Sequence, residues 1–302
     1  MKKLLGLALL YRLFGPAPSP RFREPQTHPW PLPGRTVFVG DREFVLRQTG
    51  PVDGENVVLI HGLGGASLTE WYEVGPRLAE RFRVTLVETR NHGSGTRFLG
   101  RYDITDLADD TAGVLEAAGV DRATVVGYSM GGTVALALVH RHPDLVDRLV
   151  LIGTFAAHPR SWRLARQAGT YVVRGWERIT GIGTPEVRAG YLIVTGAVAP
   201  EHARWMWEET HRRDVDGGAA ASLALMRFDA THWIGSLDVP TLVVVPTRDQ
   251  LVPPAWQYEL GGRIPRARIA DIDGARHEVP WTHADRLVAE VASFVDDGGS
   301  EK

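Results

Sequence analysis

Several kinds of residue and segment are scarce or missing in this sequence of 302 residues. It contains no cysteine, which excludes disulfide bonds, a thiol nucleophile and cysteine-ligated zinc or iron–sulfur sites. No apolar run reaches the length of about 18 residues that a membrane-spanning helix needs. The net charge is −2, from 34 basic and 36 acidic residues, so no basic excess favours nucleic acid as a partner.

What remains is the composition of an ordinary globular protein. Hydrophobic residues make up 44% of the chain and charged residues 23%, which is enough apolar material for a large core. At about 150 residues per domain the length predicts two domains, although α/β folds can reach about 250 residues as one unit.

Residues 1–34 differ from the rest of the chain. Two lysines precede the apolar run 4–10, and Arg12 follows it. Three interpretations stay open: a helix docked on the protein itself, a peripheral membrane contact through residues 1–14, or an export signal without a clean cleavage site. Seven prolines in residues 16–33 then predict a stiff, extended arm. We expect a cytoplasmic protein, with membrane association or export as alternatives.

Beyond this arm, short β-rich runs alternate with helical patterns. The runs that predict strands are 36–40, 43–48, 56–60, 84–88, 123–128, 148–153, 241–245 and a short one before the loop at 273–277. The patterns that predict helices are 67–81, 104–118, 130–140 and 282–295. Most of the runs are apolar on both faces, which is typical of buried parallel strands. The sequence therefore predicts an α/β fold, with a mostly parallel, doubly wound sheet of about eight strands and helices on both faces.

One interval breaks this alternation. Residues 156–236 follow the sixth strand and have the pattern of several helices. We expect a helical cap there, a core formed by residues 35–155 and 237–297, and a tail at 298–302. Five of the nine tryptophans lie in the cap: Trp162, Trp176, Trp205, Trp207 and Trp233. They either line an apolar pocket or pack within the cap.

The most informative segment ends a strand and begins a helix. It holds the pattern G-x-S-x-G as Gly127-Tyr128-Ser129-Met130-Gly131. A serine at such a strained strand-to-helix turn exposes its hydroxyl above the sheet, and the glycines allow the close backbone contacts that the turn needs. Ser129 is therefore the predicted nucleophile.

A serine hydroxyl needs a base, and in this kind of site the order along the chain is serine, acid, histidine. Among the 11 histidines, His277 is the one that follows Ser129 in a loop after a predicted strand. His277 is therefore the predicted base.

The acid should follow a strand between the serine and the histidine. Asp249 lies a few residues beyond the strand 241–245. Asp271 and Asp273 are its rivals, although carboxylates so near His277 along the chain rarely orient the ring from behind.

Two backbone N–H groups should stabilise an oxyanion. Met130, just after the nucleophile, supplies one of them. Leu63 supplies the other, from the glycine-rich loop His61-Gly62-Leu63-Gly64-Gly65 after the third strand. We expect His61 itself to be a structural hydrogen-bonding residue.

Together these features resemble the α/β-hydrolase superfamily in its capped form, over about residues 35 to 297. The motifs that carry the resemblance are HGLGG (61–65), RNHGSG (90–95), GYSMGG (127–132), PTRDQLVP (246–253) and GARH (274–277). It implies a catalytic triad of Ser129, Asp249 and His277 and an oxyanion hole of Leu63 and Met130. It implies no metal and no organic cofactor. The turn after the fourth strand departs from the family pattern. Glu88 stands where many relatives have an aspartate, and Asn91 and Thr96 also differ from that pattern.

The leading functional hypothesis is a serine hydrolase that cleaves small apolar esters, of short or medium acyl chains or of the monoacylglycerol type. It rests on a pocket lined by the cap tryptophans. The alternatives are a carbon–carbon bond hydrolase of a dienoic ketone, an acyltransferase or perhydrolase, and a non-enzymatic module that retains the pocket for ligand binding. The sequence carries no indication of the oligomeric state.

Overall fold

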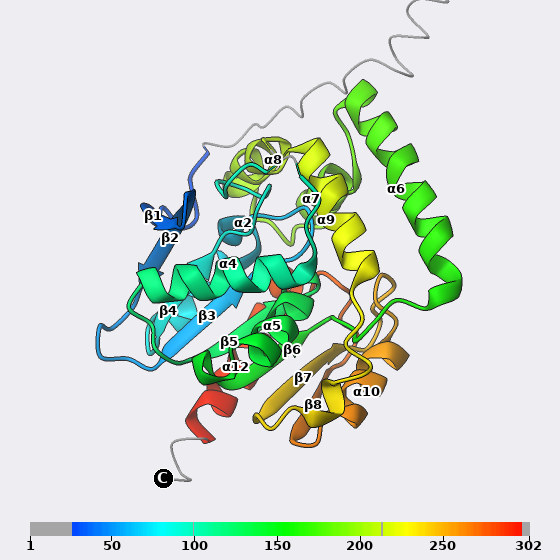
Figure 1. The fold of residues 1–302 in the computed structure, drawn as a ribbon. Helices are drawn as coiled ribbons and strands as arrows, with labels where there is room; N and C mark the ends of the chain where they lie inside the picture. Colours follow the sequence, from blue (N-terminus) through cyan, green and yellow to red (C-terminus); the bar gives the residue numbers. More distant parts are fainter. Residues whose placement is uncertain (1–25, 99, 213, 298–302) are drawn as a thin grey trace, which may run out of the picture.

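The computed structural model describes residues 26–98, 100–212 and 214–297. The predicted N-terminal segment 1–14 and the tail 298–302 lie outside these ranges, and the interpretations of residues 1–14 remain predictions. In Figure 1 the described chain forms one sheet with helices on both faces and further helices above one end.

The sheet has eight strands in the order β1-β2-β4-β3-β5-β6-β7-β8. The strands are β1 (Arg35–Val39), β2 (Arg42–Thr49), β3 (Asn56–Ile60), β4 (Arg83–Val87), β5 (Ala123–Tyr128), β6 (Val146–Ile152), β7 (Thr241–Pro246) and β8 (Ala267–Ile272). β1 and β2 form an antiparallel hairpin, β2 also runs antiparallel to β4, and the remaining neighbours are parallel. The mostly parallel, eight-stranded sheet is confirmed.

Burial along the strands explains their composition. Every residue of β5 and of β7 is buried, because helices cover both faces of the central sheet. The edge strands β1 and β8 are mostly half-buried or exposed, and they carry arginine and aspartate among their apolar residues. The continuous apolar runs therefore mark the centre of the sheet, and mixed composition marks its edges.

Helices cover the sheet in two layers (Figure 1). The core cluster on one face includes residues from α4 (Ile104–Ala117), α5 (Met130–Arg141) and α10 (Pro254–Arg263). The cluster on the other face includes residues from α2 (Ser67–Trp71), α3 (Gly75–Leu78), α11 (Val279–Thr282) and α12 (Ala284–Asp297).

One predicted helix is divided in the structure, and another is preceded by a short additional helix. The single helix predicted over 67–81 is wrong: α2 and α3 are separate, and Pro76 lies in the first turn of α3. Proline cannot donate the backbone hydrogen bond of a helix interior, so it begins a new helix instead. The last helix, predicted over 282–295, is likewise preceded by the short α11, with Pro280 in its first turn.

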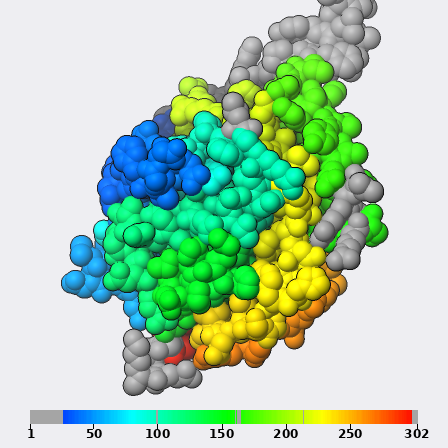
Figure 2. Space-filling model, viewed as in Figure 1, coloured from blue at the N-terminus to red at the C-terminus, as the bar shows by residue number. Residues whose placement is uncertain are grey.

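Four α-helices lie between β6 and β7, within the interval where several helices were predicted. They are α6 (Arg160–Thr180), α7 (Thr184–Val194), α8 (Ala203–His211) and α9 (Val215–Arg227). α6 packs against α9 and runs along the outside of the molecule, as Figure 1 shows. In Figure 2 its surface forms one flank of the molecule, next to that of α9.

The strand order places the predicted site. The chain moves from β3 to β4 on one side and then to β5 on the other side of β3, so the order reverses between β3 and β5. In open α/β sheets, ligands bind at the carboxyl ends of the strands beside such a reversal. The glycine-rich loop and Ser129 follow these two strands directly.

Candidate active site

Ser129 lies between β5 and α5 in a strained backbone conformation, with φ 53° and ψ −115°. Such a conformation costs about 1–3 kcal/mol and persists only where neighbours hold it. The Ser129 N–H donates to Ile152 O at 2.8 Å, and its C=O accepts from Thr154 Oγ1 at 2.8 Å. A Cβ at Gly127 would lie 2.3 Å from Gly131 O, so the turn closes only with glycine there.

The structure brings the three predicted side chains together. Ser129 Oγ lies 3.0 Å from His277 Nε2, and His277 Nδ1 lies 2.7 Å from Asp249 Oδ2. An ionised carboxylate only accepts hydrogen bonds, so His277 Nδ1–H donates to Asp249. Nε2 of the neutral ring is then the acceptor for the hydroxyl of Ser129. This arrangement allows the ring to take the serine proton.

Asp249 is held by the loop in which it lies. Its Oδ1 accepts from the backbone N–H groups of Leu251 and Val252, each at 2.9 Å, and its Oδ2 accepts from Gln257 Nε2 at 3.2 Å. Gln257 lies in α10, is fully buried and also donates to Val252 O at 2.8 Å. Gln257 was not predicted from the sequence, because a glutamine in the first turns of a helix belongs to no motif.

The rival acids lie elsewhere. Asp271 accepts a hydrogen bond from Tyr258 at 2.9 Å on the exposed surface of β8, and Asp273 is exposed in the following turn. The carboxylate that contacts His277 is that of Asp249.

The His277 ring is fixed from two further directions. Tyr128 OH donates to the backbone oxygen of His277 at 2.8 Å, and the two rings lie 5.1 Å apart. Burial raises the pKa of Tyr128 well above its usual value, so it remains a donor at neutral pH. Gly153, at φ +56°, comes so close that a Cβ there would lie 3.4 Å from His277 Nδ1.

The loops after β7 and β8 are joined to each other by their backbones. Thr247 N–H donates to Ile272 O at 3.2 Å, and Arg248 N–H donates to Ala275 O at 2.8 Å. The Thr247 hydroxyl also accepts from Gly274 N–H at 2.9 Å. These bonds link the loop that carries Asp249 to the loop that carries His277.

The two predicted oxyanion donors flank Ser129. Met130 is the first residue of α5. Leu63 lines the same cavity as Ser129, and a Cβ on the preceding Gly62 would lie 3.2 Å from Ser129 Cβ. The donor role of Leu63 and Met130 stays a prediction.

A buried carboxylate supports the loop that contains Leu63. Gly62 N–H donates to Glu70 Oε2 at 2.5 Å, and Glu70 is fully buried in α2. Glu70 Oε1 lies 3.1 Å from Arg188 Nη2 of α7. No motif indicates this role of Glu70, since the contacts join residues from separate elements.

Glu88, in the turn after β4, is the residue that departs from the family pattern, and it has a structural role. Glu88 is buried, and its carboxylate accepts from Ser67 N–H at 2.7 Å and from Ser67 Oγ at 3.0 Å. His61 accepts from Thr89 N–H at 3.1 Å and lies 2.8 Å from Gly62 O, as a structural histidine should. Glu88 thus anchors the start of α2.

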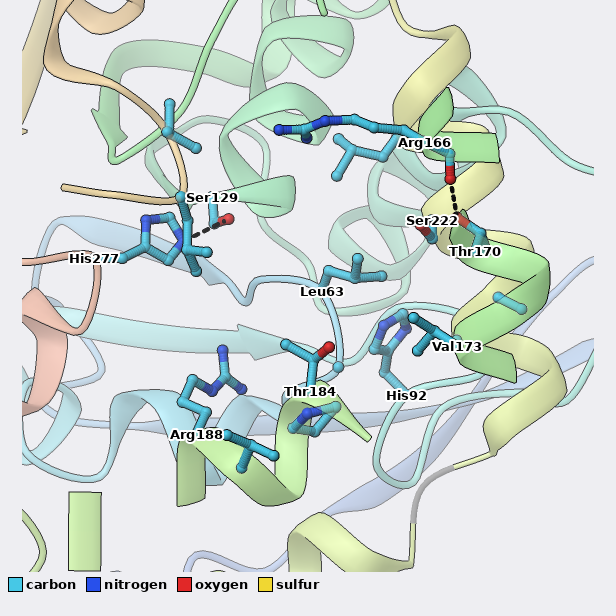
Figure 3. A pocket seen from close by; sticks show the side chains of 18 of the residues that line it. Leu63, His92, Ser129, Arg166, Thr170, Val173, Thr184, Arg188, Ser222 and His277 are labelled. Carbon is cyan, nitrogen blue, oxygen red and sulfur yellow. Dashed lines mark hydrogen bonds between the residues drawn. The ribbon is translucent and has the colours of Figure 1, made fainter. Parts of the chain in front are cut away.

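Ser129 opens onto a cavity of about 620 Å³ between the sheet and the helices above it. Its walls come from the loops after β3, β4 and β7, from α6, α7 and α9, and from the loop that carries His277. Figure 3 shows Ser129 and His277 on one side of this space, with residues of α6 and α7 around it. The volume is within the range of about 300–1,000 Å³ that is common for small-molecule sites.

Of the two alternatives for the cap tryptophans, the one in which they line this cavity is wrong for the four whose side chains are described. Trp205 packs against Tyr72, Trp207 stacks on His211, and Trp233 stacks on His140. Trp176 is 48% exposed on α6, and the side chain of Trp162 lies outside the described part of the chain. These four side chains pack within or outside the cap, and the lining instead includes several arginines.

His92 is a buried histidine beside the cavity. Its Nδ1 lies 2.8 Å from Arg90 O, and burial lowers its pKa to about 3. The ring is therefore neutral at physiological pH, with the Nδ1 proton donated to the carbonyl.

The described residues lack two features, a cluster of metal ligands and a membrane-spanning helix. Within 26–98, 100–212 and 214–297, no group of three or more His, Asp or Glu side chains is arranged to hold a metal ion. In the same ranges, no helix combines the length and the apolar character needed to cross a membrane.

Similarity to known proteins indicates the family of this chain. The model of the alpha/beta hydrolase fold family matches residues 55–183. A Caulobacter segnis protein named "Putative carbamate hydrolase RutD" is 30% identical over 256 residues, which cover 82% of this chain and 93% of that protein. A pimeloyl-(acyl-carrier protein) methyl ester esterase of Neisseria meningitidis is 28% identical over 267 residues, covering 83% and 97% of the two chains.

A solved structure supports the same assignment. The enol-lactonase from Burkholderia xenovorans LB400 superposes with a TM-score of 0.73 at 25% identity, over 87% of this chain and all of the other. This chain therefore belongs to the α/β-hydrolase superfamily.

Proposed function

We propose that this superfamily member hydrolyses carboxylic esters through an acyl-enzyme intermediate. The observation that carries the proposal is the hydrogen-bonded chain from Ser129 through His277 to Asp249, which opens onto the cavity. The esterase and carbamate hydrolase among the relatives support hydrolysis as the type of reaction.

The first half of the reaction forms the acyl-enzyme. His277 Nε2 takes the proton of Ser129 as Oγ attacks the ester carbonyl, and Asp249 stabilises the positive ring that results. The N–H groups of Leu63 and Met130 stabilise the negative oxygen, each worth about 3–4 kcal/mol in the transition state. His277 then gives its proton to the alcohol that leaves.

The second half returns the enzyme to its starting state. Water enters as the alcohol departs, and His277 takes a proton from it as the water oxygen attacks the acyl carbonyl. Collapse of this second tetrahedral intermediate releases the acid and returns the proton to Ser129 Oγ. The cavity supports an acyl group of short or medium length.

The test is hydrolysis of 4-nitrophenyl hexanoate by wild type and by Ser129→Ala. We expect the variant to lose turnover by about four orders of magnitude or more, since the attacking oxygen is gone. Ser236→Ala, an exposed serine after α9, serves as the control and should retain wild-type turnover. Equal rates for wild type and Ser129→Ala would overturn the proposal in favour of a binding module.

A further inference from the structure

The cavity above Ser129 is lined by charged side chains as well as by apolar ones. Four arginines line it: Arg166, Arg174, Arg188 and Arg276. Three acidic side chains also do so: Glu177, Asp214 and Glu278. The excess of positive charge is small, so the direction in which each guanidinium group points decides what it can contact in the cavity.

Arg188 is held in place while most of its guanidinium stays available. Its side chain is 15% exposed, it lies over the Trp281 ring at 5.1 Å, and its Nη2 is 3.1 Å from Glu70 Oε1. That contact lacks hydrogen-bond alignment, since Glu70 Oε1 is buried with no hydrogen-bond donor in the described part of the chain. The five donors of the guanidinium are therefore not saturated by their protein neighbours.

Figure 3 shows how two of these arginines are directed. Arg188 extends from α7, and its guanidinium points into the cavity below Ser129. Arg166 extends from α6 on the opposite wall, and its guanidinium reaches across the cavity above Ser129. Arg166 is half-buried there, and burial lowers the pKa of its guanidinium.

The other two arginines contribute less. Arg174 is engaged by Asp216, with Nε 2.7 Å from Oδ1. Arg276 is exposed at the rim, in the same loop as Glu278. Asp214 accepts the backbone N–H groups at the start of α9. The inward-pointing cations are thus Arg166 and Arg188.

We propose that Arg166 and Arg188 bind a carboxylate on the substrate, so that the natural substrates are esters that carry an anionic group away from the reacting carbonyl. A guanidinium matches a carboxylate with two parallel hydrogen bonds, and such charge-assisted bonds are about twice as strong as neutral ones. The inference deepens the proposed function, on which it rests, and replaces the purely apolar ester expected from the sequence.

The test compares esters that differ by one terminal group. 4-Nitrophenyl hexanoate is the neutral substrate, and mono-4-nitrophenyl adipate has a carboxylate in place of the last methyl group. A third ester, 3-carboxy-4-nitrophenyl hexanoate, carries the carboxylate on the alcohol side. The readout is the ratio of kcat/KM for each anionic ester to that for the neutral ester, with kcat and KM measured separately.

Two variants address the arginines without removing the catalytic machinery. Arg166→Gln removes the cation on α6, and Arg188→Lys keeps a positive charge beside Glu70 but loses the planar fork. We expect each to lower the ratio for at least one anionic ester by about 10- to 100-fold, mainly through KM, as charge-assisted hydrogen bonds imply. Arg212→Gln, on the exposed end of α8, should leave the ratio unchanged.

The outcomes separate this inference from the proposed function. If the neutral ester is hydrolysed in a manner that depends on Ser129, but both arginine variants keep the wild-type ratio for both anionic esters, the carboxylate site is wrong and the esterase stands. If none of the esters is hydrolysed above the rate of Ser129→Ala, the proposed function itself is wrong.

Discussion

The strand ends that carry the predicted triad and the helices above them are held by different kinds of interaction. Asp249 has a fully buried side chain that accepts hydrogen bonds from two backbone N–H groups, Gln257 and His277. Asp216, in α9, has a side chain that is 37% exposed and pairs with the long side chains of Arg174 and Arg178. Backbone donors are fixed by the fold, whereas exposed ion pairs lose entropy and are screened by salt.

The same contrast holds for apolar residues. The central strands β5 and β7 are buried throughout. The helices α6 and α7 instead leave large apolar side chains exposed: Tyr171, Val172, Val173, Trp176, Ile179, Val187, Tyr191 and Val194. The difference teaches that the predicted triad lies at the ends of fully buried strands, while the helices that form the cavity walls expose much of their apolar surface.

The strongest test of this comparison is Asp249→Asn. An amide keeps an oxygen for the backbone N–H groups but turns a donor toward His277 Nδ1, which favours the wrong tautomer of the ring. We expect kcat for 4-nitrophenyl hexanoate to fall by about four orders of magnitude, with the fold retained by near-ultraviolet circular dichroism. Asp271→Asn is the matched control. Near-normal activity of the Asp249 variant would pass the role of the acid to Asp271 or Asp273.

The next largest effect is the contribution of His92 to the pH dependence of the free energy of unfolding. In the folded protein burial lowers its pKa to about 3, while in the unfolded chain the pKa is about 6.5. Between these values the unfolded chain binds more protons, so this residue makes the free energy of unfolding fall as pH falls. The slope is about 1.4 kcal/mol per pH unit in the middle of the window.

His92→Gln should remove this contribution. Urea unfolding at about pH 6, 5 and 4 gives the free energy of unfolding of wild type and of the variant. These pH values lie between the two pKa values of His92. The loss of stability on acidification should be smaller in the variant than in wild type. The exposed His232→Gln is the control and should follow wild type. Parallel curves for wild type and His92→Gln would contradict the neutral, buried state of this ring.

The smallest effect is expected from Asp216→Asn in the cap. The pKa of Asp216 is lowered by Arg178 and then by Arg174, but the carboxylate is exposed and screened by solvent. We expect a loss of about 0.5–1 kcal/mol in the free energy of unfolding at low salt. That loss should shrink when salt is added. A larger loss that is insensitive to salt would contradict the comparison, because it would show that α6 and α9 are held together as strongly as the strand ends.

Much of the sheet and of the site could be predicted because each depends on local patterns. Continuous apolar runs mark buried strands, and the glycines around Ser129 are required by contacts within a few residues. The order serine, acid, histidine then selected Asp249 and His277, because both follow strands whose carboxyl ends lie at one edge of the sheet.

What could not be predicted depends on contacts between distant segments. Glu70 of α2 supports Gly62 and pairs with Arg188 of α7, and neither contact leaves a pattern in the sequence. For a related reason, the sequence could not decide whether the tryptophans line the cavity. Composition shows that a segment is rich in aromatic residues, but helix packing decides which way Trp205 and Trp233 face.

The backbone bonds between the loops after β7 and β8 have a consequence for how the site fluctuates. Because these bonds tie the two loops together, the imidazole and its carboxylate belong to one stiff unit, while the hydroxyl belongs to another strand, β5. Tyr128, the last residue of β5, also donates to His277 O, so a shift of β5 reaches the histidine loop through two contacts, the hydroxyl of Ser129 and the phenol of Tyr128. The bond from His277 Nδ1 to Asp249 lies outside these contacts, so the tautomer of the ring is kept when β5 shifts.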